Sequence, residues 1–115
     1  MEERRGYRRS ALVYYLKVHD ADSGELLGHL ADITPQGLRV VGPDLALVPH
    51  RRYRLRIEMP EQYRDAGDPV LEADCLWSGP DVNPDLHAAG LRFADLDPVR
   101  QQTVEDLIHL LGLAI

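Results

Sequence analysis

The sequence is poor in cysteine and in large aromatic residues, with one Cys, one Trp and one Phe among 115 residues. The single Cys75 excludes an intramolecular disulfide and a cysteine-rich metal site. No apolar run reaches the roughly 18 residues of a membrane-spanning helix, and no signal-peptide core follows the charged start. We therefore expect a soluble, cytoplasmic protein without membrane insertion.

Positive charge is scarce and concentrated at one end. Thirteen Lys and Arg face nineteen Asp and Glu, for a net charge of −6. Residues 1–9 hold four Arg and two Glu, so they carry +2 and leave −8 on the rest. Duplex nucleic acid and membrane surfaces select positive charge spread over a whole face, which disfavours both as partners. A compact arginine cluster is suited to bind a small anionic ligand. Considered alone, the cluster is also compatible with a solvated N-terminus that has no function.

Hydrophobic periodicity indicates a chain built mainly of strands. Arg52–Met59 alternates strictly between apolar and charged residues, as a half-buried strand does, so its arginines are expected on the wet face. Clusters of Asp, Ser, Pro and Gly separate this segment from others of similar length. The expected strands are Ala11–Val18, Glu25–Ala31, Leu38–Val41, Arg52–Met59, Val70–Trp77 and Leu86–Phe93, and Pro60–Pro69 and Ser78–Asp85 are expected to be loops.

Two residues of the fifth segment have more than one interpretation. Alternation places Trp77 and Cys75 on one side of the strand with Leu71. Cys75 is then a small buried hydrophobe, not a nucleophile. Trp77 either packs in the barrel or forms a stacking surface beside a ligand. Gly90, in the last strand, indicates a bulge or a close approach of another segment.

The end of the chain changes to helical periodicity. Asp97-Pro98 provides an N-cap followed by proline at the first helical position. The apolar stripe that follows consists of Val104, Leu107, Ile108 and Leu111. Gly112 is typical of a helix stop, so a helix over about residues 97–112 is predicted. The fold class is therefore mainly β: a six-stranded antiparallel β-barrel with a C-terminal α-helix packed on it.

Two short motifs combine in the first third of the chain. The first is Arg5-x-x-x-Arg9, just before the first expected strand, and the second is Asp32-x-Thr34-x-x-Gly37, in the turn before the third. The second motif alone is also compatible with an ordinary turn. Together, in this order and on this pattern of elements, the two motifs resemble the PilZ domain, a bacterial receptor module for cyclic di-GMP.

The resemblance covers nearly the whole chain. It continues through Leu38-Arg39-Val40, Trp77-Ser78 and Gly90-Leu91-Arg92-Phe93 to the closing helix. It departs from the family pattern at Thr34, where Ser is usual, and at Gln36, where a small residue is common. Thr34 keeps the hydroxyl but adds a methyl group beside the expected ligand.

The resemblance implies a binding role for each motif residue. Arg5 and Arg9 would converge on phosphate oxygens or on a guanine edge, or stack on a base. Asp32 would accept hydrogen bonds from a guanine Watson–Crick edge, and Thr34 would supply a hydroxyl. Gly37 would let the backbone approach the ligand. In this family an arginine at the position of Arg4 is associated with binding a stacked dimer of cyclic di-GMP.

The implied function is that of a cyclic di-GMP receptor without catalytic activity or cofactor. Residues 1–9 would form a flexible arm that becomes ordered over the barrel domain of residues 10–115, and so passes the signal to a partner protein. The alternative is a ligand-independent adaptor that binds a partner through apolar residues such as Leu110, Leu113 and Ile115. An oligonucleotide-binding barrel is disfavoured because aromatics and positive charge are few. An enzyme is disfavoured because no cluster of nucleophile, base or metal ligands is seen, and the His19-Asp20 pair is explained by a turn.

Overall fold

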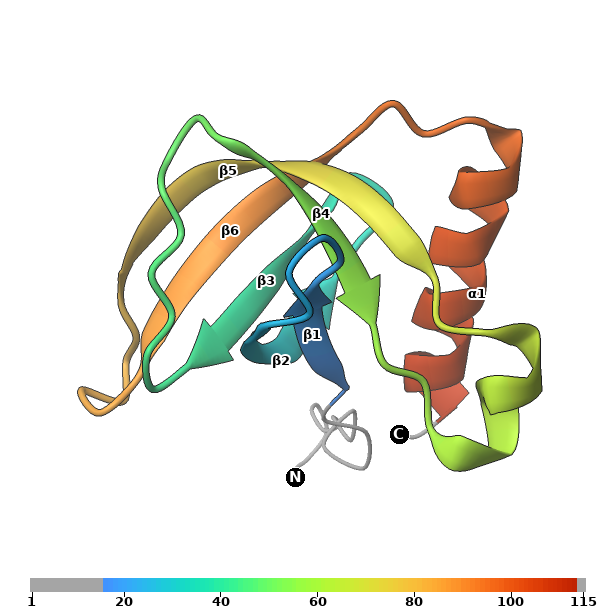
Figure 1. The fold of residues 1–115 in the computed structure, drawn as a ribbon, viewed down its shortest axis with the longest axis horizontal. Coiled ribbons are helices and arrows are strands. Elements are labelled where there is room, and N and C mark those ends of the chain that lie inside the picture. Colours follow the sequence, from blue (N-terminus) through green and yellow to red (C-terminus); the bar gives the residue numbers. More distant parts are fainter. Residues whose placement is uncertain (1–15, 114–115) are drawn as a thin grey trace, which may run out of the picture.

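A computed structural model describes residues 16–113 of the chain. Within this range six antiparallel strands close into a barrel, with an α-helix beside one end (Figure 1). The order of strands around the barrel is β1-β2-β3-β6-β5-β4. Their bounds are β1 Lys17–Asp20, β2 Leu26–Ile33, β3 Gly37–Gly42, β4 Arg52–Ile57, β5 Val70–Pro80 and β6 His87–Ala94. The predicted six-stranded antiparallel barrel with a C-terminal helix is confirmed.

The barrel interior is filled by the apolar half of each alternating strand. In β4, Leu55 and Ile57 are fully buried, while Arg52 and Arg54 are exposed, as the alternation predicted. No polar or charged residue is buried within residues 16–113. The interior is therefore a packed hydrophobic core, and a polar ligand has to bind on the outside of the barrel.

The helix α1, Pro98–Leu113, covers one end of this core (Figure 1). The amide of Arg100 donates to Oδ1 of Asp97 at 2.8 Å, so Asp97 is the N-cap and Pro98 is the first helical residue, as predicted. Val104 and Leu107 are almost completely buried. The helix was predicted over about residues 97–112, and α1 continues through Gly112 to Leu113, one residue further.

Tertiary pairing moved several boundaries away from their predicted positions. β5 continues to Pro80, inside the predicted loop Ser78–Asp85, because Ser78 and Pro80 pair with β6 in a long hairpin. β2 continues through Asp32 into the predicted turn. The predicted loop Pro60–Pro69 contains a short 3₁₀ helix, η2, at Glu61–Ala66. The part of the first predicted strand before Leu16 lies outside the described residues.

A β-bulge in β5 reverses the predicted orientation of Trp77. The register with β6 shifts between Cys75 and Trp77, so Leu76 and Trp77 both lie outside the barrel, 49% and 46% exposed. The prediction that Trp77 shares the inner face with Cys75 is therefore wrong. Cys75 itself is fully buried, as predicted, and burial raises the pKa of its thiol.

Candidate functional site

Four residues on adjacent strands form a line across the outer face of the barrel, which we call the outer row. Trp77 of β5 pairs with Gly90 of β6, and Gly90 pairs with Arg39 of β3. Arg39 in turn pairs with Asp32 of β2. Directly paired residues point to the same face of a sheet. The barrel thus presents an indole, a gap, a guanidinium and a carboxylate side by side.

The gap at Gly90 is occupied by the indole of Trp77. A Cβ placed on Gly90 would lie 2.2 Å from Nε1 and 2.6 Å from Cε2 of that indole. The pyrrole part of Trp77 therefore lies over the backbone of β6, next to Arg39 in the outer row. Of the two interpretations of Trp77, the exposed surface beside the candidate site is the one that the structure favours.

The turn between β2 and β3 is built by the predicted motif residues. Oγ1 of Thr34 accepts hydrogen bonds from the amides of Gln36 and Gly37, at 3.2 and 3.3 Å. Asp32 is exposed, and its Oδ1 accepts from the amide of Ile33 at 2.9 Å. No residue within 16–113 bonds to the other carboxylate oxygen of Asp32. The hydroxyl of Thr34 thus fixes the turn, and one oxygen of Asp32 remains available to a ligand.

Gly37 has a structural reason to be glycine. A Cβ at this position would lie 2.1 Å from the carbonyl oxygen of Leu91 on β6. Any side chain at Gly37 would therefore push β3 away from β6. The absence of a Cβ lets the two strands pair directly below the candidate site.

A pocket of about 400 Å³ connects this turn with the outer row. Its charged lining residues are Asp32, Arg39 and Arg92. The other lining residues are Ile33, Thr34, Gln36, Gly37, Leu38, Leu76, Trp77, Gly90 and Leu91. The structure thus places Asp32, Thr34 and Gly37, three of the predicted site residues, in one pocket lining. The described part of the lining carries one more positive than negative charge, although the whole chain is acidic.

Sequence reasoning missed Arg39 and Arg92 as residues of this pocket. A usable signal was present, because Arg39 follows Gly37, and Arg92 follows Gly90, by two positions in a strand. Residues two apart in a strand point to the same face. Each arginine therefore lies on the same outer surface as a glycine of the site.

The predicted site residues Arg4, Arg5 and Arg9 lie outside the described residues. Leu16 is the first described residue, and its carbonyl accepts a hydrogen bond from the amide of Leu30 at 2.8 Å. Leu30 precedes Asp32 by two positions on β2. The chain therefore enters the barrel next to the strand that carries Asp32. Arg9 is seven residues before Leu16, so its Cα can lie at most about 25 Å from that of Leu16.

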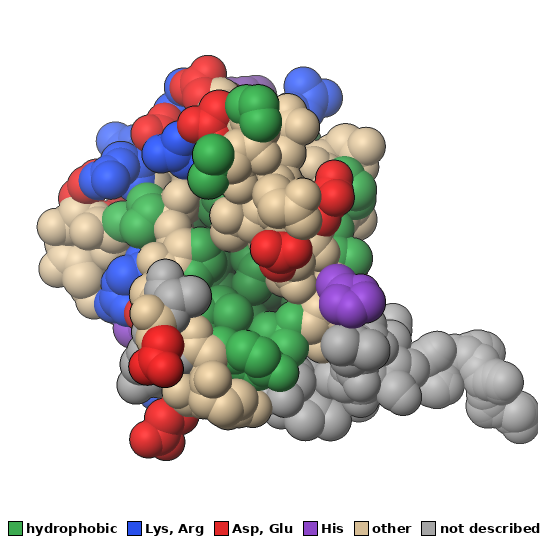
Figure 2. All heavy atoms as spheres, turned by 90° about the vertical axis from the view of Figure 1, so that its right-hand side faces the viewer, with side chains coloured by type: hydrophobic (Ala, Val, Ile, Leu, Met, Phe, Trp, Pro, Cys, Tyr) green, Lys and Arg blue, Asp and Glu red, His purple; other side chains and the backbone are tan. Residues whose placement is uncertain are grey.

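A second, more apolar pocket of about 550 Å³ lies between the η2 segment and α1. Figure 2 shows hydrophobic side chains on the floor of a hollow on this face. The lining residues are Met59, Tyr63, Gly67, Asp68, Pro69, Thr103, Asp106, Leu107, His109 and Leu110. Leu110, one of the residues of the adaptor alternative, belongs to this pocket, whereas Ile115 lies outside the described residues.

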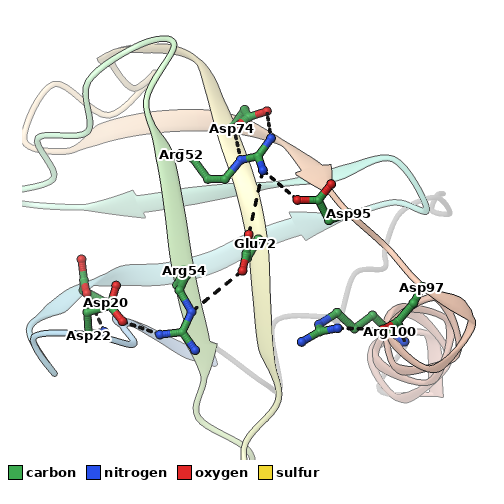
Figure 3. A network of polar contacts seen from close by, with 9 residues as sticks. All are labelled: Asp20, Asp22, Arg52, Arg54, Glu72, Asp74, Asp95, Asp97 and Arg100. Carbon is green, nitrogen blue, oxygen red and sulfur yellow. Dashed lines mark hydrogen bonds and ion pairs between the residues drawn. The ribbon is translucent and has the colours of Figure 1, made fainter.

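Two arginines of β4, Arg52 and Arg54, form ion pairs with residues of neighbouring segments (Figure 3). Arg52 donates to both carboxylate oxygens of Asp74 on β5, at 2.9 and 3.2 Å, and to Asp95 at 2.7 Å. Arg54 pairs with Asp22. The two hydrogen bonds between Arg52 and Asp74 lower the pKa of Asp74 and raise the pKa of Arg52, because each charged group stabilises the other. These arginines link β4 to neighbouring segments through ion pairs. This agrees with the prediction that they lie on the solvent-exposed face of the strand.

The remaining chemical candidates have structural roles. Nε2 of His19 lies 2.8 Å from Glu58, and the carboxylate of Asp20 accepts from the amides of Asp22 and Ser23 in the β1–β2 turn. Among residues 16–113, no three His, Cys, Asp or Glu side chains are grouped as a metal site would require. None of the helices described is long and apolar enough to cross a membrane.

The fold and the site together define a small closed β-barrel domain that carries its candidate ligand pocket on the outer face, beside a turn of the form Asp-x-Thr-x-x-Gly. The chain belongs to the PilZ domain family, whose model matches residues 3–110. PilZ domains are receptor domains without catalytic activity. The match begins before Arg4, so it includes Arg4, Arg5 and Arg9, which precede the described residues.

Several solved structures share this fold. The Bacillus subtilis inhibitor of motility, MotI/DgrA, has a TM-score of 0.68 and 22% identity over 97% of this chain and 52% of its own. The PilZ domain of YcgR from Escherichia coli, solved with c-di-GMP, has a TM-score of 0.61 and 15% identity over 85% and 81%. PlzA of Borreliella burgdorferi, in complex with c-di-GMP, has a TM-score of 0.55 and 14% identity over 86% and 45%.

At such identities these likenesses establish the fold alone, and this chain spans about half the length of MotI/DgrA and of PlzA. No curated protein sequence matches the chain.

Proposed function

We propose that this chain is a receptor for cyclic di-GMP that binds the ligand between its N-terminal arm and the outer row. The observation that carries the proposal is the outer row itself, in which Trp77, Arg39 and Asp32 are adjacent beside the motif turn. The ligand contains two guanines and two phosphates, so it needs a stacking surface, acceptors for guanine N–H groups, and cations. The described pocket supplies each of these groups.

The structures of YcgR and PlzA support the identity of the ligand, since both proteins share this fold and both were solved with c-di-GMP. In our proposal Asp32 accepts from the Watson–Crick edge of a guanine, because one of its carboxylate oxygens has no partner among residues 16–113. Arg5 and Arg9 contact phosphates or the O6/N7 edge of a guanine. Thr34 and Gly37 act mainly by holding the turn and by admitting the ligand close to the backbone.

The arm of residues 1–9 provides the proposed switch. It carries +2, whereas the barrel domain of residues 10–115 carries −8. A ligand with two negative charges that bridges the arm and the pocket would fix the arm over the barrel. Such a disorder-to-order step reshapes the surface that a partner protein reads. Arg4 would contact a second ligand molecule, if the ligand binds as a stacked dimer.

The partner in this proposal is a protein. MotI/DgrA, which has the same fold, is an inhibitor of motility. In our proposal the receptor exerts its effect by contacting another protein once the ligand is bound.

The test is a calorimetric titration of cyclic di-GMP into the full chain, with Arg5→Ala and Asp32→Ala as site variants. Arg54→Ala is the matched control, because it removes one exposed guanidinium that pairs with Asp22 on another part of the barrel. We expect micromolar or tighter binding by the wild type and the control, and a loss of about tenfold or more in each site variant. Cyclic di-AMP, which lacks the guanine edge, should bind far more weakly.

The stoichiometry and the arm are tested in the same samples. Two ligands per chain, reduced to one by Arg4→Ala, would support the stacked dimer, and one ligand per wild-type chain would refute it. Amide exchange in residues 1–9 should slow on ligand addition. Absence of binding by the wild type would overturn the receptor proposal and favour the ligand-independent adaptor, with the pocket at Leu110 as the first surface to mutate.

A further inference from the structure

Arg39 has a competing partner at the edge of the pocket. Its Nη1 lies 3.3 Å from Oδ1 of Asp81, a residue of the turn that joins β5 and β6. The side chain of Asp81 is 18% exposed and that of Arg39 is 42% exposed. This ion pair joins the candidate pocket to a hairpin turn 42 residues further along the chain.

The geometry of this pair is weak compared with other pairs on the same barrel. Arg39 contacts Asp81 through one nitrogen and one oxygen at 3.3 Å. Arg52, by contrast, contacts Asp74 through two nitrogens and two oxygens, at 2.9 and 3.2 Å. A single long contact leaves most of the five donors of this half-exposed guanidinium without a partner among residues 16–113. This guanidinium is therefore available to a stronger acceptor.

Arg39 is also placed where a phosphate of the proposed ligand would lie. In the outer row, Asp32 lies on one side of Arg39, and the indole of Trp77, which covers Gly90, lies on the other. A dinucleotide whose guanines lie toward Asp32 and Trp77 has its phosphates between them. A phosphodiester accepts both arms of an arginine fork, which Asp81 does not do here.

We propose that Arg39 is a further ligand-binding residue, which exchanges Asp81 for a phosphodiester oxygen of the bound dinucleotide. The inference rests on the proposed receptor function and adds a residue outside the two sequence motifs. Asp81 then acts as a built-in competitor, because its pairing with Arg39 has to be given up on binding. Removing the carboxylate of Asp81 should therefore strengthen binding, which a purely structural role of Arg39 would not explain.

The experiment compares dissociation constants of cyclic di-GMP for five forms of the full chain. These are the wild type, Arg39→Ala, Asp81→Asn, the double variant, and Asp85→Asn. Asp85 lies exposed in the same turn, so its substitution makes the same change in net charge without touching Arg39. Thermal unfolding of each form checks that the fold is kept, and Arg39→Lys provides a second variant that retains the charge.

We expect Arg39→Ala to weaken binding about tenfold or more, and Arg39→Lys to weaken it less. Asp81→Asn should tighten binding about threefold or more, beyond any change in Asp85→Asn. In the double variant the effect of Asp81→Asn should disappear, because the two side chains act on the ligand through one contact.

The outcomes separate this inference from the function on which it rests. If the wild type binds, Asp32→Ala does not, and Arg39→Ala binds like the wild type, the receptor function stands and the role of Arg39 is wrong. Equal tightening by Asp81→Asn and Asp85→Asn would show a general charge effect and would refute the exchange. If the wild type does not bind, the receptor proposal fails and this inference fails with it.

Discussion

The indole of Trp77 fills the space over Gly90 that a side chain on residue 90 would need. The distance from a Cβ on Gly90 to Nε1 of Trp77 would be 2.2 Å. The β-bulge between Cys75 and Trp77 makes this contact possible, because it turns Trp77 from the inner to the outer face of β5. One irregularity in one strand thus places the single tryptophan of the chain beside the candidate ligand pocket.

Gly90→Ala should therefore move the indole without unfolding the barrel. The neighbour that a methyl group meets is a half-exposed side chain, which can rotate away. We expect a loss of at most about 1 kcal/mol in the free energy of unfolding. The emission spectrum of Trp77 should shift, and cyclic di-GMP should bind more weakly. An unchanged spectrum would show that the indole does not rest on Gly90 in solution.

Gly37→Ala makes a matched comparison with the opposite expectation. Here a methyl group meets the carbonyl oxygen of Leu91 at 2.1 Å, and a backbone atom in a paired strand cannot rotate away. We expect a loss of about 1–3 kcal/mol in the free energy of unfolding, because β3 and β6 have to separate locally. Chemical denaturation of both variants under one set of conditions measures the difference. Equal losses in the two variants would contradict this account.

Trp77→Ala tests the stacking surface directly. The side chain is 46% exposed, so its removal should change the stability little. Stacking of a base on an aromatic residue contributes about 1–3 kcal/mol, so the affinity for cyclic di-GMP should fall about 5- to 150-fold. Trp77→Phe should retain most of the affinity. In the wild type, ligand addition should quench the fluorescence of Trp77. If calorimetry detects binding but the fluorescence does not change, the ligand does not bind beside Trp77.

The parts of the fold that local sequence determines were predictable. The alternation in β4 and the Asp97-Pro98 start of α1 follow from side-chain chemistry within a few residues, and the structure confirms both. The bulge in β5 was not predictable in the same way. It depends on Gly90, which is 13 positions from Trp77 and meets it only after β5 and β6 pair.

The candidate site divides in the same way. Asp32, Thr34 and Gly37 form one turn, so a local motif could identify them. Arg39 and Arg92 enter the pocket through strand pairing, and the ion pair of Arg39 depends on a turn far along the chain. Strand alternation alone puts Arg39 on the same face as Gly37, and Arg92 on the same face as Gly90. Asp81 as a partner of Arg39 required the structure.

The packing of α1 can be tested with two substitutions on the same helix. Leu107 is 2% exposed and packs in the core, whereas Val99 is 75% exposed. Leu107→Ala should cost about 2–5 kcal/mol of unfolding free energy, through lost burial and the cavity left behind. Val99→Ala should change it by less than about 0.5 kcal/mol. Similar small losses in both variants would mean that α1 is not docked on the barrel in solution.

The ion pair between Arg52 and Asp74 predicts a specific pH dependence of stability. Hydrogen bonds from Arg52 lower the pKa of Asp74 below its ordinary value of 3.8. A carboxyl group with a lowered pKa in the folded state stabilises that state above its ordinary pKa, and this contribution is lost as the pH falls through the lowered value. Asp74→Asn should therefore be less stable than the wild type at pH 7, by an amount that stays constant down to about pH 5.

Below pH 3.8 the two proteins should converge, since the wild-type carboxylate becomes protonated and loses its charge-assisted bonds to Arg52. Denaturant unfolding of both proteins between pH 7 and pH 2.5 measures the difference. Asp85→Asn is the control, because it removes the same charge from an exposed turn, and its difference from the wild type should not follow this course. A gap between wild type and Asp74→Asn that persists at the lowest pH would show that Asp74 stabilises the barrel by packing and not by its charge.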